Sequence, residues 1–170
     1  DLIIGAPLRD AAVLVPVVDH PGEATVLLTK RTDRLRSHSG QVAFPGGRID
    51  PTDATPEDAA LRETMEEIGL PASRIDIVGR MPDYLTGSAY RIAPVLGVVR
   101  PGFQLAINQD EVDHAFEVPL RFLMDPANHR RESAIWKERE RFYYDISYDD
   151  RRIWGVTAGI LRMLYNRLYK

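Results

Sequence analysis

Short apolar runs separated by turn residues dominate the pattern of this chain and predict strands. Segment 11–18, AAVLVPVV, is almost wholly apolar, which indicates a buried strand. A second apolar run at 24–30 follows the turn signal HPGE, so the two segments are predicted to form a β-hairpin. The same criteria predict further strands at 41–44, 75–80, 92–99 and 114–118.

Helix signals gather in the middle of the chain. Thr55 suits the N-cap, Pro56 the first helical position, Asp58 a capping-box-like contact and Gly69 the C-terminal stop. We therefore predict a helix over 56–68. Three later elements are expected from periodicity and charge: a short helix at 120–124, a charged hairpin of 133–138 with 141–146, and an amphipathic helix at 156–169.

These elements define the expected fold class. Strands outnumber helices and lack a regular strand–helix–strand alternation, which favours an α+β fold with a mixed sheet sandwiched between helices. The chain has 170 residues, enough for a substantial core, so we expect one domain spanning 1–170.

Composition narrows the function classes. The formal net charge of −3 gives no basic excess for nucleic-acid binding. No apolar run approaches the roughly 18 residues of a membrane span, so no membrane partner is expected. The absence of cysteine excludes disulfides and thiol catalysis, limits metal ligands to oxygen and histidine, and suits the cytoplasmic location that we expect.

The predicted helix at 56–68 carries three close carboxylates, Glu63, Glu66 and Glu67. At about 100° per residue they fall on one side of the helix. A solvated acidic face is one interpretation, because like charges at this spacing cost only a few tenths of a kcal/mol. The other interpretation is a site for Mg²⁺ or Mn²⁺, since such ions prefer oxygen ligands and leave positions for phosphate oxygens.

The opposite side of this helix is expected to pack it against the core. The residues there are apolar: Leu61, Met65 and Ile68. Arg62 lies four residues after Asp58 and four before Glu66, so we expect it to brace the acidic side through ion pairs.

The segment GGRIDPTDATPEDAALRETMEEIGL resembles a Nudix box. That pattern is Gly, five residues, Glu, seven residues, then Arg-Glu-hydrophobic-any-Glu-Glu-any-Gly-hydrophobic; its second half runs here from Arg62 to Leu70, with Thr64 at one apolar position. The leading glycine is Gly47, one residue earlier than the pattern requires, so the first glutamate position falls on Asp53 or Ala54.

A preceding segment, LLTKRTDRLRSHSGQVAFPGG, resembles the element of the coenzyme A pyrophosphatase branch of Nudix hydrolases. Ten residues fall at the spacing of that element: Leu27, Leu28, Thr29, Arg31, Arg36, Gly40, Phe44, Pro45, Gly46 and Gly47. Thr32 replaces its serine and keeps the hydroxyl. The longer loop after Gly47 also resembles this branch.

The resemblance implies the Nudix fold and hydrolysis of the diphosphate bond of coenzyme A, giving 3′,5′-ADP and 4′-phosphopantetheine. It implies a Mg²⁺ or Mn²⁺ cofactor held mainly by Glu63, Glu66 and Glu67, with a carbonyl of Gly46 or Gly47 as a further ligand. Within the enzyme class, ADP-ribose or NADH is the alternative substrate. A Nudix module that senses a nucleotide without cleaving it is the alternative from another class.

The general base is left open between three residues. We favour Glu111, as a base or extra metal ligand, over Glu117 and His114, with a plain surface role as the alternative. Arg31 and Arg36 are predicted either to bind substrate phosphate or to serve the loop internally, through Asp33.

Two further features carry weaker expectations. Tyr84 and Tyr90 flank LTGSA, which could border a pocket, although ordinary loop packing is the expected role of both rings. The charged hairpin is expected to be mainly a solvated ribbon, with a homodimer contact along its edge as the alternative.

Overall fold

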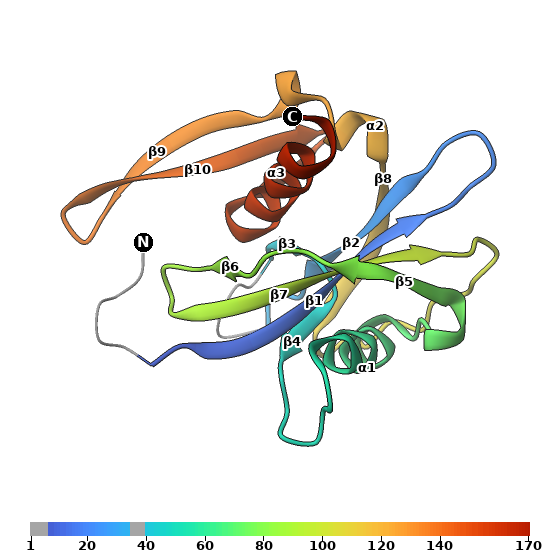
Figure 1. The fold of residues 1–170 in the computed structure, drawn as a ribbon. Helices are drawn as coiled ribbons and strands as arrows, with labels where there is room; N and C mark the ends of the chain where they lie inside the picture. Colours follow the sequence, from blue (N-terminus) through green and yellow to red (C-terminus); the bar gives the residue numbers. More distant parts are fainter. Residues whose placement is uncertain (1–6, 35–39) are drawn as a thin grey trace.

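Two β-sheets and three α-helices make up the computed structural model, which describes residues 7–34 and 40–170 (Figure 1). The larger sheet contains β1 (Arg9–Val18), β2 (Thr25–Arg31), β3 (Val42–Ala43), β4 (Gly46–Arg48), β5 (Ile75–Arg80), β6 (Tyr84–Leu85), β7 (Tyr90–Val99) and β8 (Val112–Pro119). The smaller sheet contains β9 (Arg130–Trp136), β10 (Arg139–Tyr148) and β11 (Arg151–Trp154). The helices are α1 (Pro56–Ile68), α2 (Leu120–Leu123) and α3 (Gly155–Tyr169), with short 3₁₀ turns at Ala72–Arg74 and Pro126–Asn128.

The larger sheet is mixed, as predicted. Strand β1 runs parallel to β7 along its whole length and antiparallel to β2 and β4. Strands β5 and β6 pair antiparallel with β7, and β8 pairs antiparallel with β2. The almost wholly apolar β1 therefore lies inside the sheet, where both of its faces are covered.

Strands β1 and β2 separate along the sheet, and the segment 42–48 fills the gap between them. The two strands pair only near their hairpin, at Val17↔Val26 and Val18↔Thr25. Farther along, β3 pairs with β2 and β4 pairs with β1. The Gly46-Gly47 pair thus lies within the sheet, directly beside α1 (Figure 1).

Helices cover both faces of this sheet, which confirms the predicted sandwich (Figure 1). One face packs against α1 through a cluster that includes Leu14, Leu27 and Ile68. The other face packs against α3 and the smaller sheet through a cluster that includes Val15, Leu28 and Leu161. In the described part of the chain, no helix has the length and apolar character needed to cross a membrane.

The capping residues set the bounds of α1 as predicted, from Pro56 to Ile68. The Thr55 hydroxyl accepts a hydrogen bond from the Asp58 amide over 3.1 Å, and Gly69 adopts the left-handed conformation with φ 69°. Strands β4, β6 and β11 were not predicted. They contain two to four residues each, too few for an apolar alternation to be recognised.

The predicted packing face of α1 is wrong at Met65, a residue that is 53% exposed. The helix instead buries Ala59, Ala60 and Thr64 together with Ile68. These small side chains let the helix backbone approach the sheet closely, so the buried arc is rotated toward the carboxylates. Glu67 consequently lies inside, with 2% of its surface exposed.

Candidate functional site

Among the residues that the structure describes, Glu67 is the least exposed charged residue, at 2%. Its Oε1 accepts a hydrogen bond from the Gly46 amide over 3.4 Å, while its buried Oε2 has no hydrogen-bond partner among the described residues. Burial raises its pKa to about 8, and the negative charges of Glu63 and Glu111 add to this rise. A buried, unpartnered carboxylate oxygen is costly unless a cation or donor reaches it. The solvated-face interpretation therefore fails for Glu67.

Glu63 lies against the second glycine of the pair. A Cβ on Gly47 would stand 2.8 Å from the Glu63 carboxylate carbon, so the Glu63 carboxylate occupies the space that a side chain at position 47 would take. Burial raises the pKa of Glu63, and its hydrogen bond to Arg62 opposes that rise. Both glycines therefore act on the acidic cluster: Gly46 through its amide and Gly47 through its missing side chain.

Arg62 braces the acidic side of α1, as predicted, but with a different set of partners. Its guanidinium contacts Glu63 at 3.0 Å and Glu66 at 3.3 Å. Its closest partner is Asp53 at 2.8 Å, where the sequence had suggested Asp58. The hydrogen bond from Arg62 lowers the pKa of Asp53 to about 2. Asp53, one of the two candidates for the first glutamate position of the Nudix box, thus has a structural role as the partner of Arg62.

The charges of Arg31 and Glu111 both shift the pKa of the buried Glu67 carboxylate. The positive charge of Arg31 lowers the pKa of Glu67, whereas Glu111 raises it. Glu111 also raises the pKa of Glu63, so it lies within electrostatic range of both helix carboxylates. A backbone hydrogen bond holds Glu111 beside the end of β2: the Thr32 amide donates to the Glu111 carbonyl over 3.1 Å. The charge of Arg31 therefore reaches Glu67, and its pairing with Asp33 stays a prediction.

The donor set fits a hard divalent cation. It offers the unpartnered Glu67 Oε2, the neighbouring Glu63 carboxylate and the negative charge of Glu111. Among residues 7–34 and 40–170, however, no three aspartate, glutamate or histidine side chains are already placed so that together they could hold a metal ion. Arg62 pairs with both Glu63 and Glu66 and occupies some of their oxygens. An arriving cation would take these oxygens from the guanidinium.

The two other candidate bases lie away from this cluster. The His114 ring forms hydrogen bonds with Asp113 over 2.6 Å and with Arg151 over 2.7 Å. Together with Lys30 and Trp154, it lines a cavity of about 410 Å³. The Glu117 carboxylate bonds His20 Nε2 at 2.6 Å and the Thr25 hydroxyl at 2.5 Å. Both side chains are therefore engaged elsewhere on the sheet.

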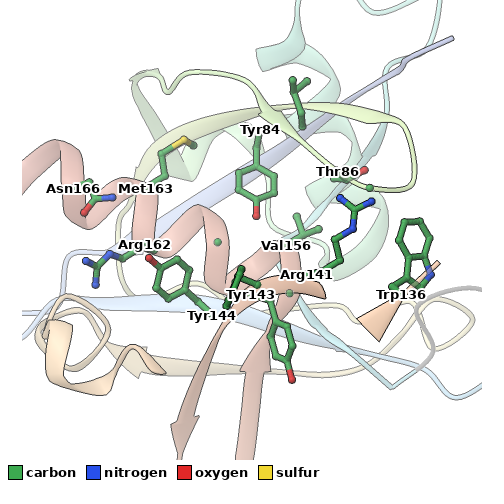
Figure 2. A pocket seen from close by; sticks show the side chains of 15 residues that line it. Tyr84, Thr86, Trp136, Arg141, Tyr143, Tyr144, Val156, Arg162, Met163 and Asn166 are labelled. Atoms are coloured by element: carbon green, nitrogen blue, oxygen red, sulfur yellow. The ribbon is translucent and has the colours of Figure 1, made fainter. Parts of the chain in front are cut away.

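Three predicted features have separate outcomes. Arg36 lies outside the described residues. Tyr90 packs under Arg9, whose guanidinium carbon is 4.3 Å from the ring centre. Tyr84 lines a cavity of about 440 Å³ formed with α3 and the β9–β10 hairpin (Figure 2). Tyr84, beside LTGSA, was the one sign of this cavity in the sequence; the other walls lie more than 40 residues away along the chain.

Comparison with known proteins agrees with this arrangement. The family model described as NUDIX domain matches residues 8–152. A Klebsiella pneumoniae protein named "Uncharacterized Nudix hydrolase NudL" is 40% identical over 164 residues, covering 92% of this chain and 81% of the relative. Proteins of the same name from Cronobacter sakazakii and Escherichia coli are 41% and 38% identical, with the same coverage.

Solved structures share the fold at low sequence identity. The NUDIX domain of Shewanella oneidensis NrtR, solved with ADP ribose, superposes with a TM-score of 0.57 at 17% identity, covering 97% of this chain and 90% of that one. A MutT/nudix family protein from Enterococcus faecalis gives 0.59 at 16% identity, covering 96% and 62%. A Caenorhabditis elegans Ap4A hydrolase gives 0.56 at 20% identity, covering 65% and 80%.

The family match covers most of the chain and includes the whole acidic cluster around Glu67 and the glycine pair. Nudix hydrolases act on nucleotide-type small molecules and generally use divalent ions such as Mg²⁺ or Mn²⁺. The fold, the sequence relatives and the family model agree: the chain belongs to the Nudix hydrolase family.

Proposed function

We propose that this protein hydrolyses the diphosphate bond of coenzyme A or its derivatives at the acidic side of α1, with Mg²⁺ or Mn²⁺. The observation that carries the proposal is the buried Glu67 carboxylate, with one oxygen unpartnered among the described residues and two further acidic charges nearby. Such a group is unfavourable in a folded protein by itself. The buried Glu67 carboxylate becomes favourable if a cation binds to it and also binds the phosphate oxygens of a substrate.

The metal ligands in this proposal are Glu63, Glu66 and Glu67, with a backbone oxygen of Gly47. A divalent ion bound there would neutralise the diphosphate charge and promote ionisation of the attacking water. Gly46 fixes the Glu67 carboxylate through its amide, and Gly47 leaves the space that Glu63 occupies. Glu66 and Glu67 are accordingly the residues that we assign to catalysis on the helix.

Glu111 is the proposed general base. Its charge acts on Glu63 and Glu67, so it borders the cluster without belonging to α1. In the reaction, a water oxygen bonds to one phosphorus while the bond from that phosphorus to the bridging oxygen breaks. Glu111 accepts the proton that the water loses, and the released phosphate carries the electron pair of the broken bond.

The assignment to coenzyme A rests on the branch element in the sequence and on the position of Arg31. Arg31 lies at the end of β2, and its charge acts on Glu67. A guanidinium so close to the cluster can bind substrate phosphate bidentately. Arg36 of the same element and the backbone of Gly46 and Gly47 complete the proposed phosphate contacts.

One substrate panel tests this assignment. It contains coenzyme A, acyl and oxidised forms of coenzyme A, ADP-ribose and NADH, each with Mg²⁺ and with Mn²⁺. We expect kcat/KM to be highest for a coenzyme A form, with 3′,5′-ADP as one product. A clear preference for ADP-ribose or NADH would overturn the coenzyme A assignment and keep the Nudix one, whereas binding without turnover would support a sensing role.

Two wider statements belong to the same proposal. We assign 1–170 to one domain, supported by the shared core in which residues of β1, β2, β11 and α3 pack together. We also assign a homodimer contact to β9, an outer strand of the smaller sheet whose Ile135 is 81% exposed. The molar mass in solution tests the contact: we expect twice 19.2 kDa, and a mass of one chain would overturn it.

A further inference from the structure

A second concave site lies on the α3 side of the main sheet. It is the cavity of about 440 Å³ enclosed by the β6–β7 turn, the β9–β10 hairpin and α3 (Figure 2). Helix α1, with its carboxylates, covers the opposite face of the same sheet (Figure 1). The cavity is therefore separate from the acidic cluster, and the proposed hydrolysis makes no use of it. Its volume is in the range of small-molecule sites in proteins.

The charge of the cavity differs from that of the whole chain. The chain has 25 acidic and 22 basic residues, yet the cavity lining contains two arginines and neither aspartate nor glutamate among the described residues. Arg162 contacts His129 and lies over the Tyr144 ring. Arg141 extends its guanidinium along the cavity toward Thr86 (Figure 2). This lining favours an anion.

Aromatic rings form much of the remaining wall. Tyr84 directs its hydroxyl end toward α3 and Val156 (Figure 2). Its ring packs directly on the helix, because a Cβ on Gly159 would stand 2.7 Å from Tyr84 Cζ. Trp136 leaves 43% of its surface exposed at the mouth, with Lys137 Nζ 4.6 Å and the Arg141 guanidinium carbon 5.6 Å from its ring centre. An exposed indole beside a cation offers a flat surface on which a ligand ring can stack.

We propose that this cavity binds a nucleoside monophosphate, with its base stacked on Trp136 and its phosphate at Arg141. The two contacts are neighbours on the hairpin, as the base and phosphate of one ligand require. Asn166 lies at the other end of the cavity, on α3, across from Trp136 (Figure 2). Occupancy would join the hairpin to α3 and the β6–β7 turn.

Equilibrium binding of AMP to the whole chain in EDTA tests the proposal, because EDTA keeps metal-bound nucleotide away from the acidic cluster. We expect saturable binding that Trp136→Ala and Arg141→Gln each weaken at least tenfold. Matched controls are Tyr169→Ala and Arg121→Gln, exposed residues outside the cavity, which should leave the affinity unchanged. Absence of binding at millimolar AMP, or equal affinity in all four variants, would overturn the proposal.

Component probes and labelling make the test independent of folding in any one variant. Adenosine and inorganic phosphate should each bind more weakly than AMP, and phosphate binding as tight as that of AMP would exclude a role for the ring. Photolabelling of the wild-type chain with 8-azido-AMP should modify peptides from 130–148 or α3. Labelling confined to 46–70 would place the nucleotide at the acidic cluster and overturn the second site.

Discussion

The backbone amide of Gly46 donates a hydrogen bond to the Glu67 carboxylate over 3.4 Å, and this contact links the central sheet to α1. It holds an acidic side chain that is only 2% exposed. The glycine pair, the helix carboxylates and the Arg62–Asp53 pair all surround this contact. Each can be altered separately, so the proposed site makes separable predictions.

The two glycines should respond differently to substitution by alanine. A Cβ on Gly46 would stand 2.7 Å from Val13 Cα, inside the β1–β4 pairing, and we expect Gly46→Ala to lower the unfolding free energy by about 1–3 kcal/mol. A Cβ on Gly47 meets the Glu63 carboxylate, which can move. We therefore expect Gly47→Ala to lower kcat/KM by about 100-fold with a smaller loss of stability.

Urea denaturation and steady-state kinetics of both glycine variants check this contrast. Gly22, which has φ 85° and open space around its Cβ position, lies in the β1–β2 turn and provides a control for glycine strain alone. Gly22→Ala should cost stability without affecting kcat/KM. If Gly47→Ala kept wild-type activity, the proposed place of Glu63 in the metal site would be wrong.

Burial of Glu67 predicts how stability depends on pH in the metal-free protein. Its pKa of about 8 lies above the ordinary value of 4.5, so the folded protein keeps a proton that the unfolded chain has lost. The unfolding free energy should therefore fall as pH rises from about 5 to 8, by a few kcal/mol in total, since one pKa unit is worth about 1.4 kcal/mol. Tm measured in EDTA across this range should decrease.

Glu67→Gln should flatten that pH dependence, because an amide does not ionise and can still accept the Gly46 hydrogen bond. Glu138→Gln, at an exposed hairpin position, is the matched control and should keep the wild-type slope. A wild-type Tm that is constant between pH 5 and 8 would show that Glu67 does not carry the raised pKa.

Added Mg²⁺ or Mn²⁺ should stabilise the folded protein at pH 8. A ligand at 100 times its dissociation constant adds about 2.7 kcal/mol, and the buried Glu67 charge would gain a counter-ion. The rise in Tm on adding metal measures this gain. It should be absent in Glu67→Gln and reduced in Glu63→Gln. An equal rise in wild type and both variants would place the ion elsewhere.

Asp53 should control metal affinity through Arg62. Asp53→Asn removes the closest partner of Arg62, which we expect to pair more strongly with Glu63 and Glu66 and to compete with the ion. The metal dissociation constant should rise about tenfold or more, as for other residues that orient ligands. Titration calorimetry with Mn²⁺ measures it. Asp50→Asn, in the same loop, is the control, and an equal effect there would contradict this role.

Local signals in the sequence predicted the main helix and most of the sheet, because caps and apolar runs act over a few residues. Thr55 and Gly69 thus set the bounds of α1 correctly. The rotation of α1 could not be predicted from a wheel, since it depends on how closely Ala60 and Thr64 approach β1. For the same reason Met65 was assigned to the core and the burial of Glu67 was missed.

The candidate site was predicted as a set of residues and not as an arrangement. The spacing of Glu63, Glu66 and Glu67 put three carboxylates on one helix side, but the Gly46 contact depends on the separation of β1 and β2. The choice of Asp53 over Asp58 as the partner of Arg62 depends on the path of the loop, which spacing along a helix does not describe.

The most direct test of the central claim compares wild type with Glu67→Gln in the hydrolysis of coenzyme A at saturating Mg²⁺, with 3′,5′-ADP quantified as the product. Loss of several kcal/mol of charge stabilisation corresponds to about a 1,000-fold lower kcat/KM. The account predicts a loss of this size in a variant that remains folded. Hydrolysis of coenzyme A by Glu67→Gln within tenfold of the wild-type rate would contradict it.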